Sequence, residues 1–412
     1  MATALPSIDI GISGQMIGSM GKAAPDSARY IVIVINRSIP MSSTTGLNSA
    51  DSLKAAKQKD RQIQSELMAV SDRVRNNHPS LVKHQNAVGM GIFLTSILGM
   101  VLNGWLYFEG IMPVWMVIVL SAFWTSLLHE LEHDLIHYMY FRKTPFWHHV
   151  MMAGVYLARP LTQNPWVRRH THLHHHKVSG TETDLEERGI TNGESWGIRR
   201  LLMVGDNMLA FYLRIPKYFI EPRRLLKEGK VNHKDLKNLR LIAAASFTPL
   251  GTTLYLIWHL FVLFHLANGI AWTLDAQIAW PQWLLAQQDW VTGLVVVLIA
   301  PNVLRTFCLH FISSNMHYYG DNRSGIIHEQ CQVMNPWYLL PLQAFCFNFG
   351  STHAIHHFVV RDPFYIRHLA TKESHEVLRK HGIRFNDMGT FSRANRMHTK
   401  EHYAGINEAA NA

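Results

Sequence analysis

Four apolar segments constrain what this sequence of 412 residues can fold into. They run from about Asn86 to Tyr107, from Val114 to about Tyr140, from about Leu239 to Leu266, and from about Val291 to Ile312. Each has close to the roughly 20 apolar residues that a helix needs to cross a bilayer. Two of them contain a proline, Pro249 and Pro301, which membrane helices tolerate as a kink. The sequence therefore predicts an all-α integral membrane protein with about four transmembrane helices.

The basic residues are distributed unevenly between the segments. Residues 1–85 hold 10 Lys and Arg, residues 138–240 hold 18 and residues 313–412 hold 10, whereas residues 108–113 and 267–290 hold none. This asymmetry predicts that both termini and the long central loop face the cytoplasm, and it argues against a soluble helical bundle. The net charge of +10 is then expected to face anionic lipid, and nucleic acid is not expected as a partner.

The regions outside the apolar segments suggest a simple division of the chain. Residues 1–85 are mostly polar and are expected to form an N-terminal tail, with a helix over residues 51–76 that rests on the membrane surface. Met41 begins a more ordinary N-terminal sequence, so residues 1–40 are interpreted as an overextended reading frame. Residues 86–412 are expected to form one membrane domain with a cytosolic C-terminal tail.

Cysteine is scarce, and its spacing excludes several redox centres. Cys308, Cys331 and Cys346 are the only three, and no C-x-x-C pair occurs. A zinc ribbon, a rubredoxin centre and a plant-type iron–sulfur site are therefore excluded. The sequence also lacks a haem-binding HPGG segment and a G-x-G-x-x-G nucleotide motif. Any electrons that the protein uses must come from a separate carrier.

Histidine is unusually abundant, with 26 residues, and all of its clusters lie on the predicted cytoplasmic side. Imidazoles beside hydrocarbon are costly unless something uses their lone pairs, and a metal ion does so. The clustered histidines exceed the coordination number of one ion, so we predict a two-metal site in a cytosolic helical cap. Three clusters and one further histidine contribute: His129, His133 and His137; His170, His172, His174, His175 and His176; His353, His356 and His357; and His317.

Spacing suggests which histidines share a metal. Positions four apart lie on one face of a helix, so His129 and His133 can bind together, with His137 close to the same stripe. The third cluster has the spacing H-x-x-H-H. In the second cluster two registers are possible: His170 with His174 and His175, or His172 with His175 and His176.

A zinc peptidase is a more distant alternative. Residues 129–133 read HELEH and match the H-E-x-x-H motif, in which Glu130 would be the general base. Such an enzyme needs only about one further protein ligand. The second and third clusters would then have no role.

Together, the clusters resemble the three histidine boxes of the membrane fatty acid desaturase superfamily, whose members have four spans and a cytosolic di-iron site. The resemblance covers about residues 86–365 and favours the second register of the second box. His137, His170 and His174 are extra to the pattern and are expected to support the ligands, while Glu130 and Asp184 are candidates to accept imidazole N–H groups. The resemblance implies these iron ligands: His129, His133, His172, His175, His176, His317, His353, His356 and His357.

The resemblance also implies a reaction. Two iron ions and O₂ would oxidise an unactivated C–H bond of a lipid or fatty acyl substrate, and loss of a second hydrogen would leave a double bond. Hydroxylation or ketolation of a lipid or carotenoid at the same centre is the alternative. A separate electron donor of the ferredoxin, rubredoxin or cytochrome b5 type is expected, and an apolar tunnel between the spans is expected to select the chain.

Overall fold

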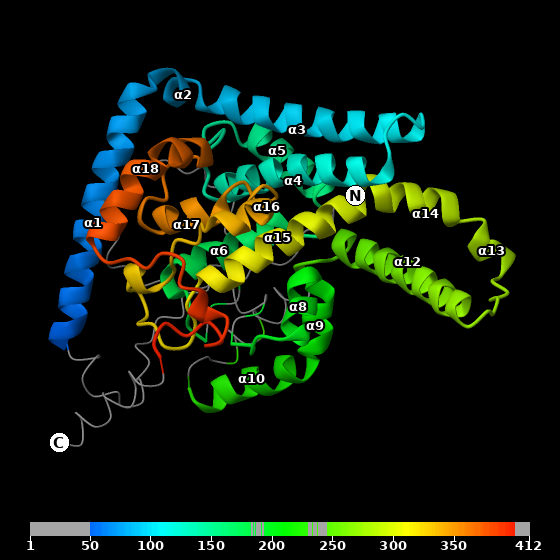
Figure 1. The fold of residues 1–412 in the computed structure, drawn as a ribbon. Helices are drawn as coiled ribbons and strands as arrows, with labels where there is room; N and C mark the ends of the chain where they lie inside the picture. The colour runs from blue at the N-terminus through cyan, green and yellow to red at the C-terminus, as the bar shows by residue number, and fades with distance from the viewer. Residues whose placement is uncertain are drawn as a thin grey trace. The chain divides into compact units, whose positions relative to one another are not determined.

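The computed structural model describes residues 50–399 except for 183, 185, 187–190, 192, 230–232, 234–236 and 238–244. Within those ranges the chain is helical and contains no β-strand, as the sequence predicts (Figure 1). The expectations for residues 1–40, and for the beginning of the third span near residue 239, fall outside the described residues.

The described helices occur in two stretches of the chain, residues 50–227 and residues 250–390 (Figure 1). The first part forms α1 (Ala50–Asn77), α2 (Pro79–Lys83), α3 (Gln85–Phe108), α4 (Val114–Ile136), α5 (Pro145–Ala158), α6 (Pro165–Val178), α8 (Ile198–Gly205), α9 (Asn207–Leu213) and α10 (Ile215–Lys227). The second part forms α12 (Leu250–Thr273), α13 (Gln282–Leu285), α14 (Gln288–Leu294), η1 (Val295–Ile299), α15 (Ala300–Met316), η2 (Ile327–Glu329), η3 (Trp337–Leu339), α16 (Leu340–Gln343), α17 (Phe349–Phe358), α18 (Phe364–Lys380) and η4 (Met388–Thr390).

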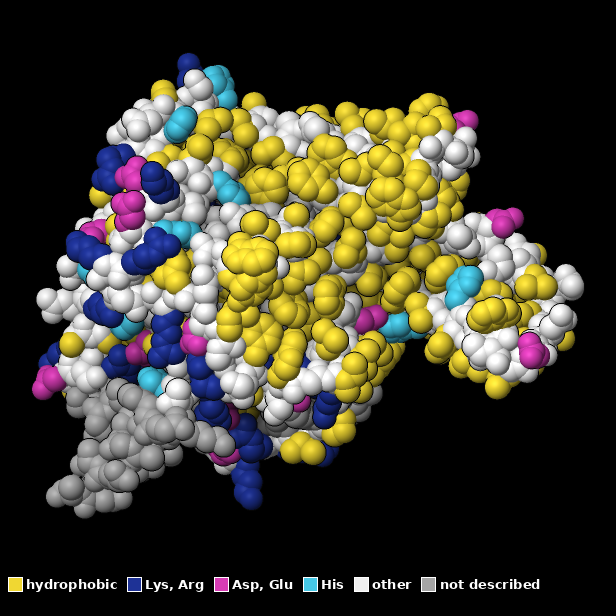
Figure 2. Space-filling view, in the orientation of Figure 1, with side chains coloured by type: hydrophobic (Ala, Val, Ile, Leu, Met, Phe, Trp, Pro, Cys, Tyr) yellow, Lys and Arg dark blue, Asp and Glu magenta, His cyan; other side chains and the backbone are white. Residues whose placement is uncertain are grey.

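Four helical stretches are long and apolar enough to cross a membrane: α3, α4, α12 and the stretch Gln282–Met316 that ends with α15. Many of their apolar side chains are exposed, including Leu98 and Val101 on α3 and Leu256 and Leu260 on α12. Figure 2 shows hydrophobic side chains gathered over one part of the visible face and Lys and Arg gathered away from it. Apolar surface of this extent is typical of contact with lipid. The prediction of an all-helical membrane protein with about four spans is confirmed.

The boundaries of three spans differ from the prediction, and the last of them runs from Gln282 to Met316 rather than from about Val291 to Ile312. α4 ends at Ile136 rather than near Tyr140, because the chain reverses at Tyr138, which has a φ of 56°. α12 begins at Leu250, directly after Pro249, and continues to Thr273. The predicted kink at Pro249 is therefore wrong. Proline is well suited to the start of a helix because its fixed φ matches the helix and its missing N–H has no partner to lose there.

The second proline does lie within a span. Pro301 follows the π-helical turn η1, and α14, η1 and α15 continue one another. Proline cannot donate a backbone hydrogen bond, and a π-turn is one way in which a helix accommodates the resulting irregularity. The span therefore continues through Pro301 to the end of α15.

The helix predicted for residues 51–76 is present as α1, and it packs against α17 and α18. Its residue Ile63 is buried in a core with Phe358. The carboxylate of Asp60 accepts hydrogen bonds from the backbone N–H groups of Ile327 and His328 at 2.8 and 3.0 Å, and lies 2.7 Å from Nδ1 of His328. The apolar face of α1 thus contacts protein rather than the membrane surface.

α3 and α4 approach each other closely at a glycine. A Cβ atom on Gly99 would lie 2.4 Å from Cε2 of Trp124, which is closer than van der Waals contact allows. In the same pair of helices, Nδ2 of Asn103 donates to Oγ of Ser121 at 3.2 Å. Small residues at such crossings let membrane helices pack backbone against side chain.

We expect Gly99→Ala to lower the melting temperature of the purified protein in detergent. The added methyl group must displace the Trp124 ring, and overpacking of this kind costs about 1–3 kcal/mol. Gly91→Ala is the matched control on the same helix, because a Cβ there has no atom within 4 Å. Equal melting temperatures for the two variants would contradict the close approach of α3 and α4.

Candidate metal centre

The first histidine cluster lies at the C-terminal end of α4. His133 is 1% exposed, and neither of its ring nitrogens has a hydrogen-bond partner among the described residues. His137 is the residue that follows the last turn of α4, and it is partly exposed. The end of this span thus carries two imidazoles, one deep and one close to the surface.

The second cluster lies on α6. This helix begins at Pro165, and the side chain of the preceding Asn164 accepts the backbone N–H of Trp166 at 3.0 Å, which caps the helix. Its three box histidines are three and four residues apart, so they share one face of the helix. His172 and His175 are buried, and the third residue, His176, is partly buried.

The third cluster lies on α17, in which every residue is buried. His353, His356 and His357 follow one another over a little more than one turn, so they also lie on one side of the helix. His317 directly follows the last residue of α15, and it is fully buried. α15 and α17 are in contact, which places His317 near the third cluster.

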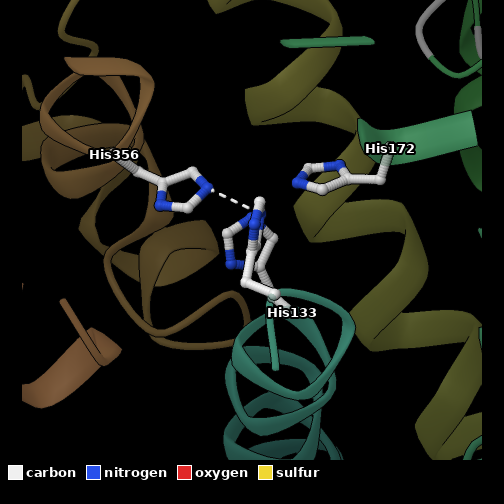
Figure 3. A group of neighbouring side chains, drawn as sticks. His133, His172 and His356 are labelled. Carbon is white, nitrogen blue, oxygen red and sulfur yellow. Dashed lines mark hydrogen bonds between the residues drawn. The ribbon is translucent and has the colours of Figure 1, made fainter. Parts of the chain in front are cut away.

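These histidines form two groups of four. In each group, one ring nitrogen from every residue lies within 4.8 Å of the other three. The first group is His133, His137, His172 and His356, and the second group is His175, His317, His353 and His357. Figure 3 shows the rings of three members of the first group pointing toward one another from α4, α6 and α17.

The two groups adjoin each other. The ring centroids of His172 and His175 are 5.7 Å apart, and those of His353 and His356 are 5.8 Å apart. His176 lies beside the first group, because its Nε2 is 3.1 Å from Nε2 of both His172 and His356. The arrangement therefore consists of two neighbouring sets of imidazole nitrogens with a ninth ring at their margin.

Acceptor groups hold the outer nitrogens of several rings. Nδ1 of His172 lies 2.6 Å from Glu186, and Nδ1 of His175 lies 2.9 Å from Asp184. In the second group, Nδ1 of His357 lies 2.6 Å from Oε1 of Gln330, and Nδ1 of His317 lies 2.9 Å from the carbonyl of residue 313. An acceptor at Nδ1 places the proton on that atom, which leaves the Nε2 lone pair directed into the group.

Burial keeps these rings neutral. It lowers the pKa of His172, His353, His356 and His357 well below the usual value, and neighbouring charges lower it further. The pKa of His317 is lowered to about 4, again mainly by burial. Neutral imidazole is the form that binds metal ions, so the protonation state suits a metal site at neutral pH.

Several ring nitrogens face each other at distances that also suit two ligands of one metal ion. Nε2 of His357 is 3.0 Å from Nε2 of His353, and Nε2 of His356 is 3.0 Å from Nε2 of His137. The contact with Gln330 holds the proton of His357 on Nδ1, so its Nε2 directs a lone pair toward His353 and is available to bind a cation. Imidazole is a good ligand for Fe, Zn, Cu and Ni. Each group can therefore hold one metal ion.

His129, predicted from sequence to be a ligand, lies outside both groups. Its Nδ1 is 3.1 Å from Nη2 of Arg159, a hydrogen-bond donor, so Nδ1 must be the acceptor and the proton resides on Nε2. Such a ring has no lone pair on Nε2. His137, assigned a supporting role from sequence, takes part in the first group instead. His129 and His133 are four residues apart, as are His133 and His137, so spacing alone does not show which pair belongs to one group.

The remaining predicted residues are distributed as follows. Asp184 contacts His175, as anticipated for a supporting carboxylate. Glu130 is hydrogen-bonded to Arg367 at 3.1 Å rather than to an imidazole. His170 and His174 lie on α6 outside both groups. Sequence reasoning missed Glu186, which follows His172 by 14 residues, and Gln330, which precedes His357 by 27 residues, because neither spacing belongs to a recognisable motif.

The H-E-x-x-H residues do not converge as a zinc peptidase requires. His133 belongs to the first group, whereas His129 contacts Arg159 and Glu130 contacts Arg367. A peptidase needs both histidines on one ion and the glutamate beside its water.

An all-helical membrane protein with two adjoining histidine groups is the class that the fold and site define. A family model described as fatty acid desaturase matches residues 109–389, which include every member of both groups. The match covers more than half of the chain, and the protein belongs to this family. A search of curated proteins finds no relative that matches.

We expect His133→Gln to reduce the iron content of reconstituted protein to about one ion per chain or less, from about two in the wild type, because it removes a central ligand of the first group. His129→Gln is the matched control on the same helix and should keep its iron. Elemental analysis of the folded, purified variants measures the number of iron ions per chain. If His129→Gln loses as much iron as His133→Gln, the first group is assigned incorrectly.

Proposed function

We propose that this protein is an O₂-dependent di-iron fatty acyl desaturase of the membrane. Family membership supports desaturase-type oxidation in general. The observation that carries the proposal is the pair of adjoining groups, each with four imidazole nitrogens within 4.8 Å. A site with eight nitrogen ligands suits two ions that act together, whereas a hydrolytic zinc site needs about four ligands including water.

The proposed iron ligands are the two groups of four, with His176 as a ninth candidate. Iron held by these residues would supply the oxidising power needed to attack an unactivated C–H bond with O₂. The chain itself fixes the orientation of the rings through Glu186, Asp184 and Gln330, whose contacts hold a proton at each Nδ1. Such outer contacts typically raise the basicity of a ligand and are important for metal affinity.

The proposed reaction balances as a four-electron reduction of O₂ to two waters. The substrate –CH₂–CH₂– loses two hydrogens, with their two electrons, and becomes –CH=CH–. Two more electrons come from a donor protein and two protons come from solvent. All four members of the second group are buried, so bulk water does not reach these rings.

We further propose that the histidine groups and both termini face the cytoplasm. The distribution of Lys and Arg along the sequence supports this orientation. The first group contains His137, which is partly exposed, and lies beside His176, which is followed by the exposed Lys177. A soluble electron donor would approach on this side, with its acidic face toward the basic surface.

We expect membranes of a host that expresses the protein to contain fatty acyl chains that have lost two hydrogens. Gas chromatography with mass spectrometry of the total lipids detects them. His356→Gln should abolish the new product, because a member of the first group is lost, while the variant still inserts into the membrane. Products that gain oxygen instead would favour the hydroxylase or ketolase alternative, and no change in any lipid would contradict both.

We expect purified protein to be inactive with NADPH alone and active when a ferredoxin or cytochrome b5 is supplied with its reductase. Lys177→Glu should raise the KM for the donor by about threefold to tenfold at low salt, because it reverses a charge near the proposed docking face. Lys177→Arg is the control, since it keeps the positive charge at the same exposed position. Turnover without any donor would contradict this prediction.

A further inference from the structure

Two arginines and a glutamate are buried close to the histidine groups. Arg159 and Arg305 are each 1% exposed, and Glu132 is fully buried. Arg305 belongs to α15 and lies inside the fourth candidate span. A buried ionisable residue within a span is costly and usually marks a functional site. We call Arg159, Arg168, Arg305, Glu132 and His129 the arginine cluster.

The charges of the arginine cluster do not balance. Glu132 forms ion pairs with both Arg159 and Arg168, and Arg168 pairs in addition with Glu186 at 3.1 Å. Arg305 has no carboxylate within ion-pair distance among the residues that the structure describes. Its Nη2 donates to Oγ1 of Thr306 at 2.9 Å. One buried positive charge is therefore left without a negative partner.

The polar atoms without partners in this cluster are hydrogen-bond donors. In the described part of the chain, Nε and Nη1 of Arg305, Nε of Arg159 and Nε2 of His129 have no hydrogen-bond partner. His129 accepts a hydrogen bond from Arg159 at Nδ1, so its Nε2 carries a proton. Asn302, three residues before Arg305 on α15, donates from Nδ2 to the carbonyl oxygen of Ala158 at 3.1 Å, and α15 packs against α4, so the residues around Arg305, Arg159 and His129 come from elements in direct contact. Several buried donors and one excess positive charge are suited to an oxygen anion.

This cluster lies next to the second histidine group. The ring of His129 is 6.0 Å from that of Phe349, and Phe349 stacks on His353 with centroids 4.1 Å apart. Along α4, His129 precedes His133 by one turn, or about 6 Å. An anion held by the cluster would therefore lie a short distance below the metal-binding nitrogens, where only an apolar tunnel was expected from the sequence.

We propose that Arg305, together with Arg159 and His129, binds the carboxylate of a free fatty acid substrate. This inference rests on the proposed function. Guanidinium groups bind carboxylates strongly because two N–H groups can match two oxygens. The carboxylate neutralises the charge of Arg305 and satisfies the open donors, and it places carbons near the carboxyl end of the chain beside the histidine groups. Esters and thioesters lack the negative charge and bind weakly.

Thermal denaturation of the purified full-length protein tests carboxylate recognition without depending on catalysis. Palmitate, methyl palmitate and acetate serve as probes below the concentration at which the lipids form micelles. We expect palmitate to bind the wild type at least about tenfold more tightly than its methyl ester and to raise the melting temperature accordingly. Equal stabilisation by acid and ester would overturn the proposal. Equal stabilisation by acetate and palmitate would identify a small-anion site and would also overturn it.

Variants of Arg305 separate ligand binding from a structural role. Arg305→Gln removes a buried charge that lacks a partner, so the ligand-free variant should melt at the same temperature as the wild type or higher, and its preference for palmitate over the ester should disappear. Arg305→Lys should keep part of the preference. Arg223→Gln, which removes an exposed arginine of α10, should keep all of it.

Other results for the Arg305 variants would also decide whether this residue binds the carboxylate. Retained preference in Arg305→Gln would contradict the assignment, and failure of both Arg305 variants to fold would assign the residue to stability instead. Because binding is measured rather than turnover, a protein that binds palmitate but never oxidises a lipid would contradict the proposed function alone. A protein that forms new double bonds but binds acid and ester equally would contradict this inference alone.

Discussion

The convergence of neutral imidazole nitrogens is the interaction on which the rest of this structure depends. Four helices, α4, α6, α15 and α17, bring histidines to two adjoining places, and burial keeps their rings uncharged. Acceptors such as Glu186 and Asp184 hold the outer ring nitrogens. Where an acceptor holds the proton on Nδ1, the Nε2 lone pair is left free to bind a cation. Helix packing, loop carboxylates and the membrane spans can all be understood as ways of holding this arrangement together.

Much of the architecture could be predicted from sequence because the signals are local. About twenty apolar residues in a row are sufficient to indicate a membrane helix, and α3 and α4 begin within one residue of the expected positions. Histidines spaced three or four apart on a helix indicate a shared face, and those of α6 and α17 do meet. Family membership agrees with the resemblance that these clusters suggested.

Other features depend on contacts that spacing cannot reveal. His129, His133 and His137 are equally spaced, and what distinguishes them is that Arg159 occupies Nδ1 of His129 while the end of α4 brings His137 to His356. Gln330 reaches its histidine from a loop after α15. The uncompensated charge of Arg305 appears only when three-dimensional partners are known, because an arginine in a sequence gives no sign of whether it is paired.

The ligand groups combine residues from distant parts of the chain, and this has a consequence for biosynthesis. His137 and His356 touch although 219 positions separate them. The spans are threaded into the bilayer in the order of translation, so the ribosome completes every membrane segment before it synthesises the last three box histidines. The complete histidine groups consequently cannot exist on a chain that ends before α17. The two groups can form only after α17 has emerged and packed against α15.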